Sequence, residues 1–265
     1  MYFDATDYII YEPYRGLHLA YHAKRFCFSK KSRFQKIDII DNEAYGRMLF
    51  LDNNVQHTEY DAHIFREALC GIAKGNGVAR ILVLGGGSGQ TLLSLLESPQ
   101  TKHVTLVEID SLVIESCRRY IRGVDRAFAD SRVEVVVGDA FKYLHSMNRE
   151  FDAAIVDFTE TPLATESNAK TLKQLYVDIR RKCNGRCSHY VGSAVDLSYN
   201  TRLRNTLYRM SKRYLTNTSY CYTFIPSFGA PHIIMHAGYK RKQPQKAGPT
   251  CNEVGREATR GNDLA

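Results

Sequence analysis

From Val78 onward, the sequence alternates between short apolar segments typical of buried strands and longer segments with helical spacing. Units of this length join parallel strands through crossover helices. They predict an α/β fold with a Rossmann-like, methyltransferase-type, mostly parallel sheet that helices cover on both faces. The predicted strands are "RILVLG", "HVTLVEID", "RVEVVVGD" and "FDAAIVDF", and the predicted helices that follow them are "TLLSLLES", "SLVIESCRRYIR", "AFKYLHSM" and "AKTLKQLYVDIRRK".

The segment after these units predicts the edge of the same sheet. Asn184-Gly185 forms a turn into the strand "CSHYVGS", and a helix covers about Tyr199 to Tyr214. Two final strands, "SYCYTFI" and "HIIMHAGY", are joined by "PSFGAP" and predict an antiparallel pair at the sheet edge.

The first 60 residues instead predict a small N-terminal β domain. The segments "FQKIDIID", "AYGRMLFLD" and "NNVQHTE" have strand character and are separated by Asp-Asn and Asn-Asn turn residues. A helix with the spacing "DAHIFREALCGIAK" begins at Asp61 and ends at Gly75. We expect three parts: a β-strand domain at 1–60, a Rossmann-like catalytic domain at 61–239 and a disordered basic tail at 240–265.

Composition narrows the class of protein. The net charge of the 265 residues is +8, but the basic residues are dispersed along predicted helices, so nucleic-acid binding is not favoured. We expect no membrane contact, because no apolar run is long enough to span a bilayer, and no secretory signal, so the cytoplasm is predicted. The pair Cys183 and Cys187, even with His189, does not complete a zinc set, and no metal site is predicted.

The glycine turn "GGGSG" at the end of the first predicted parallel strand indicates a ligand site. Its backbone N–H groups face the crevice at the carboxyl ends of the strands. Glu108 ends the next strand, where an acid accepts hydrogen bonds from ribose hydroxyls, and Asp139 ends the third, within reach of an adenine amino group. The alternatives are a plain strand–helix turn and helix N-cap acids, a role that Asp110 fits better. Since no second phosphate-binding element follows, an S-adenosyl ligand is favoured over a dinucleotide.

Acids also follow the fourth parallel strand. Asp157 ends that strand, and Glu160 lies three residues later. An alkyl amine has a pKa near 10.4 and arrives protonated, so its attack on a sulfonium-activated carbon needs a positioned base. Asp157 and Glu160 are therefore the candidate catalytic residues, with helix-cap or loop acids as the alternative interpretation.

The motifs "VLGGGSG", "LVEID", "VVVGDAF", "FDAAIVDFTETP" and "FIPSFGAP", with "SRFQKIDIIDNEAYGRMLFLDNNVQHTEYD", resemble the polyamine aminopropyltransferases from about Ser32 to Tyr239. The segment "DFTETPLAT" is most similar to the spermine synthases within that family. The resemblance implies transfer of an aminopropyl group from decarboxylated S-adenosylmethionine, a co-substrate and not a permanent cofactor, to a polyamine, with spermidine favoured and methylthioadenosine released. It also implies a possible homodimer.

The resemblance further implies roles for individual residues. Asp157 orients or deprotonates the amine, aided by Glu160. Asp61 and Phe228 contact the amine substrate. The remaining residues bind the donor: Gln35, Gln56, Gly85, Gly86, Gly87, Ser88, Glu108, Asp139 and Ala140.

Several positions on the amine side depart from the family pattern. Ser88 replaces an acid and Gln90 a glycine, while Phe228 and Ala230 lie where a tyrosine and a glutamate are usual. A tyrosine expected on the first helix is Ile64 or Phe65 here. Each lost charge-assisted bond removes about 1.5–3 kcal/mol of binding. Two alternatives therefore stay open: a non-catalytic paralogue that keeps the nucleoside pocket, and an S-adenosylmethionine-dependent N-methyltransferase.

Overall fold

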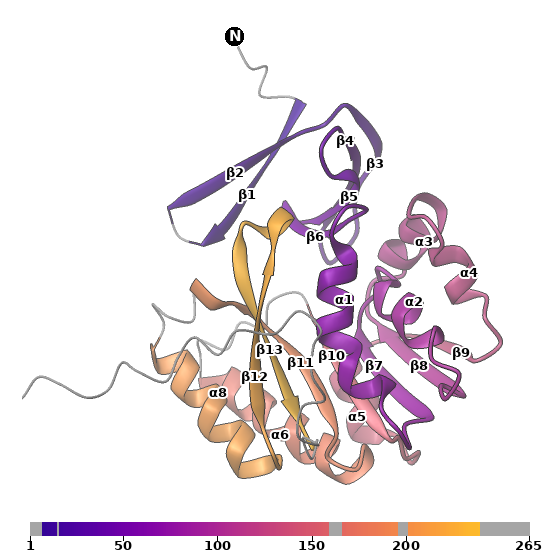
Figure 1. Cartoon of the computed structure of the whole chain (residues 1–265), viewed down its shortest axis with the longest axis vertical. Coiled ribbons are helices and arrows are strands. Elements are labelled where there is room, and N and C mark those ends of the chain that lie inside the picture. Colours follow the sequence, from indigo (N-terminus) through magenta and orange to yellow (C-terminus); the bar gives the residue numbers. More distant parts are fainter. Residues whose placement is uncertain (1–6, 15, 159–165, 196–200, 239–265) are drawn as a thin grey trace, which may run out of the picture.

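A seven-stranded sheet forms the centre of the computed structural model, which describes residues 7–14, 16–158, 166–195 and 201–238 (Figure 1). The strand order is β12-β13-β11-β10-β7-β8-β9. Strands β9, β8, β7, β10 and β11 run parallel, while β13 is antiparallel to both β11 and β12. The predicted α/β fold and its antiparallel edge pair are thus confirmed. The strands are β7 (Arg80–Gly85), β8 (His103–Glu108), β9 (Val133–Val137), β10 (Ala153–Asp157), β11 (Cys187–Ser193), β12 (Ser219–Ile225) and β13 (Ala230–Ala237).

Helices cover both faces of this sheet because its central strands are apolar on both sides. In β7, Ile81 and Val83 pack under one helical layer, and Leu82 and Leu84 pack under the other. The first layer contains α1 (Ala62–Cys70), α2 (Gln90–Leu96), α3 (Ser111–Tyr120) and α4 (Val124–Phe128). The second contains α5 (Ala140–Ser146), α6 (Glu166–Lys182) and α8 (Thr201–Tyr214).

The largest differences from the predicted helix boundaries occur at three places. The segment predicted as one helix from Asp61 divides into α1 and a short 3-10 helix, η2 (Gly71–Lys74), a tightening that is common at helix ends. The helix from Ser111 ends at Tyr120 because Ile121 is extended, and the short helix α4 after it was not predicted. Helix α6 begins at Glu166, three residues before the predicted start.

Two antiparallel sheets form the N-terminal part of the chain (Figure 1). Asp52 and Asn53 both have positive φ angles in the tight turn between β5 and β6, as a primed hairpin turn requires. The three segments predicted as strands are all strands here, and three more precede them. The strands are β1 (Tyr8–Tyr14), β2 (Leu17–His22), β3 (Arg25–Lys31), β4 (Lys36–Asn42), β5 (Gly46–Leu51) and β6 (Asn54–Thr58).

Both ends of α3 are tied to this N-terminal part. Ser32 Oγ donates a 2.7 Å hydrogen bond to Asp110 Oδ2 at the N-cap of α3, and Gln35 Nε2 donates a 3.1 Å bond to the same oxygen. At the other end, Arg47 Nη1 donates to the carbonyl oxygen of Tyr120. A cation at a helix C-terminus also interacts favourably with the helix dipole. These contacts fix the hairpin loop that carries Gln35 next to the strand end that carries Glu108.

Among the described helices, none combines the length and the apolar character that a bilayer span requires. The predicted tail at 240–265 lies outside the described residues.

Candidate functional site

A cavity of about 280 Å³ opens at the carboxyl ends of β7, β8 and β10. Its walls come from the N-terminal sheet, the glycine turn and the ends of the parallel strands. It brings together every predicted donor residue, from Gln35 and Gln56 to Glu108, Asp139 and Ala140, and also Asp157 and Phe228. The remaining lining residues are Phe34, Leu49, Leu51, Phe65, Gly85, Gly86, Gly87, Ser88, Gln90, Val107, Ile109, Val113, Phe141, Phe158 and Tyr190.

The glycine turn is packed directly against the end of β10. Gly86 N–H donates a 3.1 Å hydrogen bond to the carbonyl oxygen of Asp157. A Cβ at Gly85 would lie 2.3 Å from that same oxygen, and the φ angle of Gly85 is +82°. Only glycine permits both the angle and the approach. The turn therefore holds the backbone of Asp157 against the floor of the cavity.

Glu108 is bound to the same turn. Its Oε2 accepts a 3.0 Å hydrogen bond from Gly87 N–H, and its Oε1 accepts one of 3.0 Å from Asp110 N–H. Burial raises the pKa of this carboxyl above its usual value. Asp110, not Glu108, is the N-cap of α3, since its Oδ1 accepts from Leu112 N–H at 3.1 Å. The geometry leaves Glu108 at the cavity wall, where a ribose hydroxyl can reach it.

Asp139 both caps a helix and lines the cavity. Its Oδ1 accepts hydrogen bonds from Phe141 N–H at 2.9 Å and Lys142 N–H at 3.1 Å, which makes it the N-cap of α5. Oδ2 takes part in neither bond. The two interpretations of this acid, cap and ligand contact, are thus compatible in one side chain.

Two phenylalanines that no motif in the sequence indicated form a wall beside Asp139. The rings of Phe141 and Phe158 stack with centroids 5.0 Å apart and planes 25° apart, and both line the cavity. Flat apolar surfaces of this kind suit a nucleobase. Each phenylalanine lies one or two residues after a predicted site acid, but adjacency alone does not show that the rings meet.

Asp157 has the chemistry of a base. Burial, and then the nearby charge of Glu108, raise the pKa of its carboxyl from 3.8 to about 7. No described residue donates a hydrogen bond that would counter this rise. The side chain is half-buried and lines the cavity, so a bound ligand can reach it. Glu160, the second predicted catalytic acid, lies outside the described residues.

The part of the cavity beside Phe228 is aromatic. The ring centroids of Phe65 and Phe228 lie 6.0 Å apart, and those of Phe65 and Tyr190 lie 5.2 Å apart. Ile64 and Phe65 both pack against the core of the N-terminal part, but only Phe65 also lines the cavity, which favours Phe65 as the counterpart of the expected tyrosine. Ser88 lines the cavity at the tip of the turn.

Asp61 does not line this cavity, although it was expected to contact the amine substrate. Its side chain is buried, and Oδ1 accepts from the hydroxyls of Thr58 and Ser227 at 2.6 and 2.8 Å. Oδ2 accepts from Ser227 N–H at 2.7 Å. Tyr21 OH also donates to the carbonyl oxygen of Ser227. The acid therefore anchors the loop that carries Phe228.

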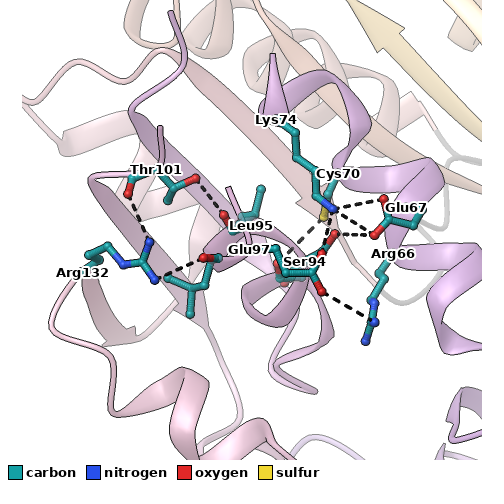
Figure 2. A network of polar contacts seen from close by, with 11 residues as sticks. Arg66, Glu67, Cys70, Lys74, Ser94, Leu95, Glu97, Thr101 and Arg132 are labelled. Atoms are coloured by element: carbon teal, nitrogen blue, oxygen red, sulfur yellow. Dashed lines mark hydrogen bonds and ion pairs between the residues drawn. The ribbon is translucent and has the colours of Figure 1, made fainter. Parts of the chain in front are cut away.

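A polar network holds α1 against α2, the helix that follows the glycine turn (Figure 2). Lys74 Nζ donates to both carboxylate oxygens of Glu67 at 2.9 and 3.0 Å and to Glu97 Oε2 at 3.2 Å. Ser94 Oγ donates to Glu67 Oε1 at 3.2 Å. These bonds tie the C-terminal half of α2 to α1 and to the 3-10 helix η2. Within the described part of the chain, no cluster of three or more metal-ligating side chains occurs.

The sequence profiles of two families match this chain. The spermine/spermidine synthase domain matches residues 62–246, and the spermidine synthase tetramerisation domain matches residues 8–59.

Individual relatives agree with those profiles. A polyamine aminopropyltransferase of Bacillus mycoides (strain KBAB4) is 36% identical over 159 residues, which are 59% of this chain and 57% of that protein. A polyamine aminopropyltransferase of Clostridium tetani (strain Massachusetts / E88) is 28% identical over 232 residues, 86% of this chain and 82% of that protein.

Solved structures share the fold. Spermidine synthase from Thermotoga maritima superposes with a TM-score of 0.74 at 23% identity, over 87% of this chain and 78% of that one. A spermidine synthase in complex with the transition state analogue AdoDATO gives a TM-score of 0.76 at 23% identity, over 87% and 80%. With the profile match across most of its length, the chain belongs to the spermine/spermidine synthase family of aminopropyltransferase enzymes.

Proposed function

We propose that the protein transfers an aminopropyl group from decarboxylated S-adenosylmethionine to a polyamine and releases methylthioadenosine. The observation that carries the proposal is the position of Asp157. Its carboxyl, with a pKa raised to about 7, lines the same cavity as the glycine turn and the two acids that suit an adenosine. A positively charged donor and a protonated amine both fit a cavity whose charged lining residues are all acidic: Glu108, Asp139 and Asp157.

The chemistry follows from this placement. A protonated amine gives its proton to the Asp157 carboxylate and becomes a nucleophile. Its nitrogen forms a bond to the carbon next to the sulfonium, the carbon–sulfur bond breaks, and its electron pair neutralises the sulfur. The stacked pair Phe141 and Phe158 holds the nucleobase, while Phe65 and Phe228 exclude water from the reacting end.

Spermidine is the proposed acceptor, since the segment after Asp157 is similar to that of spermine synthases. A second candidate is a paralogue that binds the nucleoside without turnover. The aromatic wall of Phe65 and Phe228 and the hydroxyl of Ser88 favour it, because they offer an ammonium group no carboxylate.

One assay tests these candidates. The purified protein is incubated with intact or decarboxylated S-adenosylmethionine and with putrescine, spermidine or spermine, and the thioether product is measured by mass spectrometry. We expect methylthioadenosine only with the decarboxylated donor and an amine. Nucleoside binding by calorimetry without any product would support the paralogue, and product from the intact donor would support an N-methyltransferase.

We also propose that the chain assembles as a homo-oligomer through residues 8–59, with a homodimer as the smallest unit. The match to a tetramerisation domain supports this assembly. Light scattering on the purified protein measures the number of subunits.

We propose that the chain divides into a β domain at 1–60, a catalytic domain at 61–239 and a tail at 240–265. We also propose a cytoplasmic location. Five cysteines of the described residues are free thiols, as expected in a reducing compartment: Cys27, Cys70, Cys117, Cys183 and Cys187.

A further inference from the structure

A second cavity, of about 370 Å³, shares one wall residue with the 280 Å³ cavity at the ends of β7, β8 and β10, which is called the donor cavity below after its proposed ligand. That residue is Gln90, whose side chain is buried at the start of α2 and lines both spaces. The volume falls within the range of small-molecule sites in proteins. The other polar residues that line the second cavity are His57, Glu59, His63, Arg66 and Arg122.

The two cavities differ in charge. The charged side chains of the donor cavity are all acids, whereas the second cavity has two guanidinium groups, those of Arg66 and Arg122, and a single acid. That acid, Glu59, is directed to the start of β5, where its Oε2 accepts a 3.1 Å hydrogen bond from Arg47 N–H. The net positive lining therefore favours an anion.

His57 gives the second, independent indication of a ligand. Its side chain is 5% exposed and lines the cavity, yet neither ring nitrogen has a hydrogen-bond partner among the described residues. Burial lowers the pKa of this imidazole to about 4, and the charge of Arg66 lowers it further while Asp61 raises it. The ring is thus neutral at pH 7 and keeps one unused N–H donor. Buried donors are normally paired, so this one lacks a partner that a ligand can supply.

The guanidinium of Arg66 is also only partly used. Its Nε is buried and has no partner among the described residues. Its Nη2 lies 3.9 Å from Glu97 Oε1, at the margin of the network in Figure 2, so the ion pair is loose. A guanidinium has five N–H donors in a planar fork that matches oxyanions. Arg122 is exposed, lines the cavity and takes part in none of the ion pairs between described residues.

A cation does not suit this cavity. Two histidines and one acid line it, but within the described residues no three such groups come close enough together to hold a metal ion. Asp61, a buried acid whose charge acts on His57, has both carboxylate oxygens engaged by Thr58 and Ser227. His63 is exposed and adds a further N–H donor near Arg66.

We propose that this second cavity binds a small oxyanion of the phosphate class, with Arg66 and Arg122 as its cationic partners and His57 as its buried donor. A diphosphate is the favoured size. The two guanidinium groups and the imidazole together offer more N–H donors than a pair of oxygens on a single phosphate group can accept. Since Gln90 separates this cavity from the donor cavity, the anion lies directly behind the glycine turn.

Calorimetry with inorganic diphosphate at pH 7 tests the proposal, at low ionic strength because salt screens such contacts. We expect saturable binding of one diphosphate per chain. Arg122→Gln weakens it about tenfold or more, which corresponds to about 1.4 kcal/mol. The matched control is Arg126→Gln, another exposed arginine that does not line the cavity, and it leaves the affinity unchanged. Equal losses for both variants, or no saturable binding by the unaltered protein, would overturn the proposal.

A second measurement locates the anion next to His57. It needs no substitution at Arg66, which could also disturb folding. In NMR titrations, diphosphate raises the pKa of His57, because a negative charge beside the ring favours its protonated form. Asp157→Asn, which alters only the donor cavity, leaves diphosphate affinity intact. An unmoved His57 resonance, or binding lost in Asp157→Asn, contradicts the assignment to the second cavity.

Discussion

Asp61 and Ser227 are 166 residues apart in the sequence, yet two hydrogen bonds join them: Ser227 N–H to Oδ2 at 2.7 Å and Ser227 Oγ to Oδ1 at 2.8 Å. Ser227 precedes Phe228, whose ring lines the donor cavity. The start of α1 is thereby linked to the wall of the site by a buried carboxylate.

Asp61→Asn breaks this link. An amide has one acceptor oxygen in place of two, so it cannot accept all three hydrogen bonds that the carboxylate receives from Thr58 and Ser227. We expect a loss of about 1–3 kcal/mol in the free energy of unfolding and a higher KM, measured by urea denaturation and steady-state kinetics. Asp125→Asn, at an exposed ion pair with Arg118, is the control and changes stability by less than about 0.5 kcal/mol. Equal stability of the two variants would contradict the structural role.

Gly87→Ala tests the contact between the glycine turn and Glu108. A Cβ at Gly87 would lie 2.7 Å from Glu108 Cγ and 2.8 Å from Oε2, so the acid must move from its hydrogen bond. We expect affinity for methylthioadenosine, measured by calorimetry, to fall at least about tenfold. Gly71→Ala is the matched control, because a Cβ there meets nothing within 4 Å. Unchanged nucleoside affinity in Gly87→Ala would remove Glu108 from the proposed site.

Asp157→Asn tests the base. The amide keeps the shape of the side chain but cannot take a proton, so we expect turnover to be lost while methylthioadenosine still binds. In the unaltered protein, kcat/KM rises with pH through about 7, since the carboxylate is the active form and its pKa is about 7. Glu115→Gln, at an exposed acid of α3, serves as the control with unchanged activity. Full activity of Asp157→Asn would sink the assignment.

The same carboxyl affects stability in a defined pH window. Its pKa is about 7 when folded and 3.8 when unfolded, so the folded state holds more protons between these values. The stabilisation is complete below pH 3.8 and is lost as pH rises through 7, at up to roughly 1.4 kcal/mol per pH unit. Relative to the unaltered protein, Asp157→Asn is therefore more stable at pH 8 than at pH 5. Urea denaturation at both values measures this, and a pH-independent difference would show that the carboxyl titrates normally.

Ser88→Asp restores a negative charge at the tip of the turn. A carboxylate that meets an ammonium group contributes about 1.5–3 kcal/mol, so we expect KM for the polyamine to fall about tenfold or more. Ser88→Asn is the matched control, with the same shape and no charge. An equal change in both variants, measured across putrescine, spermidine and spermine, would show that charge at this position does not govern acceptor binding.

The order and type of the central elements could be predicted from the sequence because their signals are local. Apolar runs, helical periodicity and a glycine turn each depend on residues near one another in the chain. Acids at the ends of β8, β9 and β10 could be assigned to one crevice because the carboxyl ends of parallel strands share one edge of the sheet. The break between α3 and α4 was missed, since apolar and basic residues continue through Ile121 without a strong helix breaker.

Contacts between separate segments could not be predicted in this way. The position of Asp61 in the sequence is compatible with a substrate contact. Its carboxylate instead bonds Ser227, because the fold brings the loop between β12 and β13 to the start of α1. Likewise, the stack of Phe141 on Phe158 depends on how α5 and β10 meet.

The sequence by itself determined the fold class, the glycine turn and the acids at the strand ends, because short-range periodicity and strand direction suffice for these. Only the tertiary structure decided which side of each residue faces a cavity. In the folded chain, His57 and Arg66 line the second cavity, and Gln90 lies between two cavities whose charged lining residues have opposite net charge. The physical reason is that side-chain direction and burial depend on packing between distant elements, and local spacing carries no record of that packing.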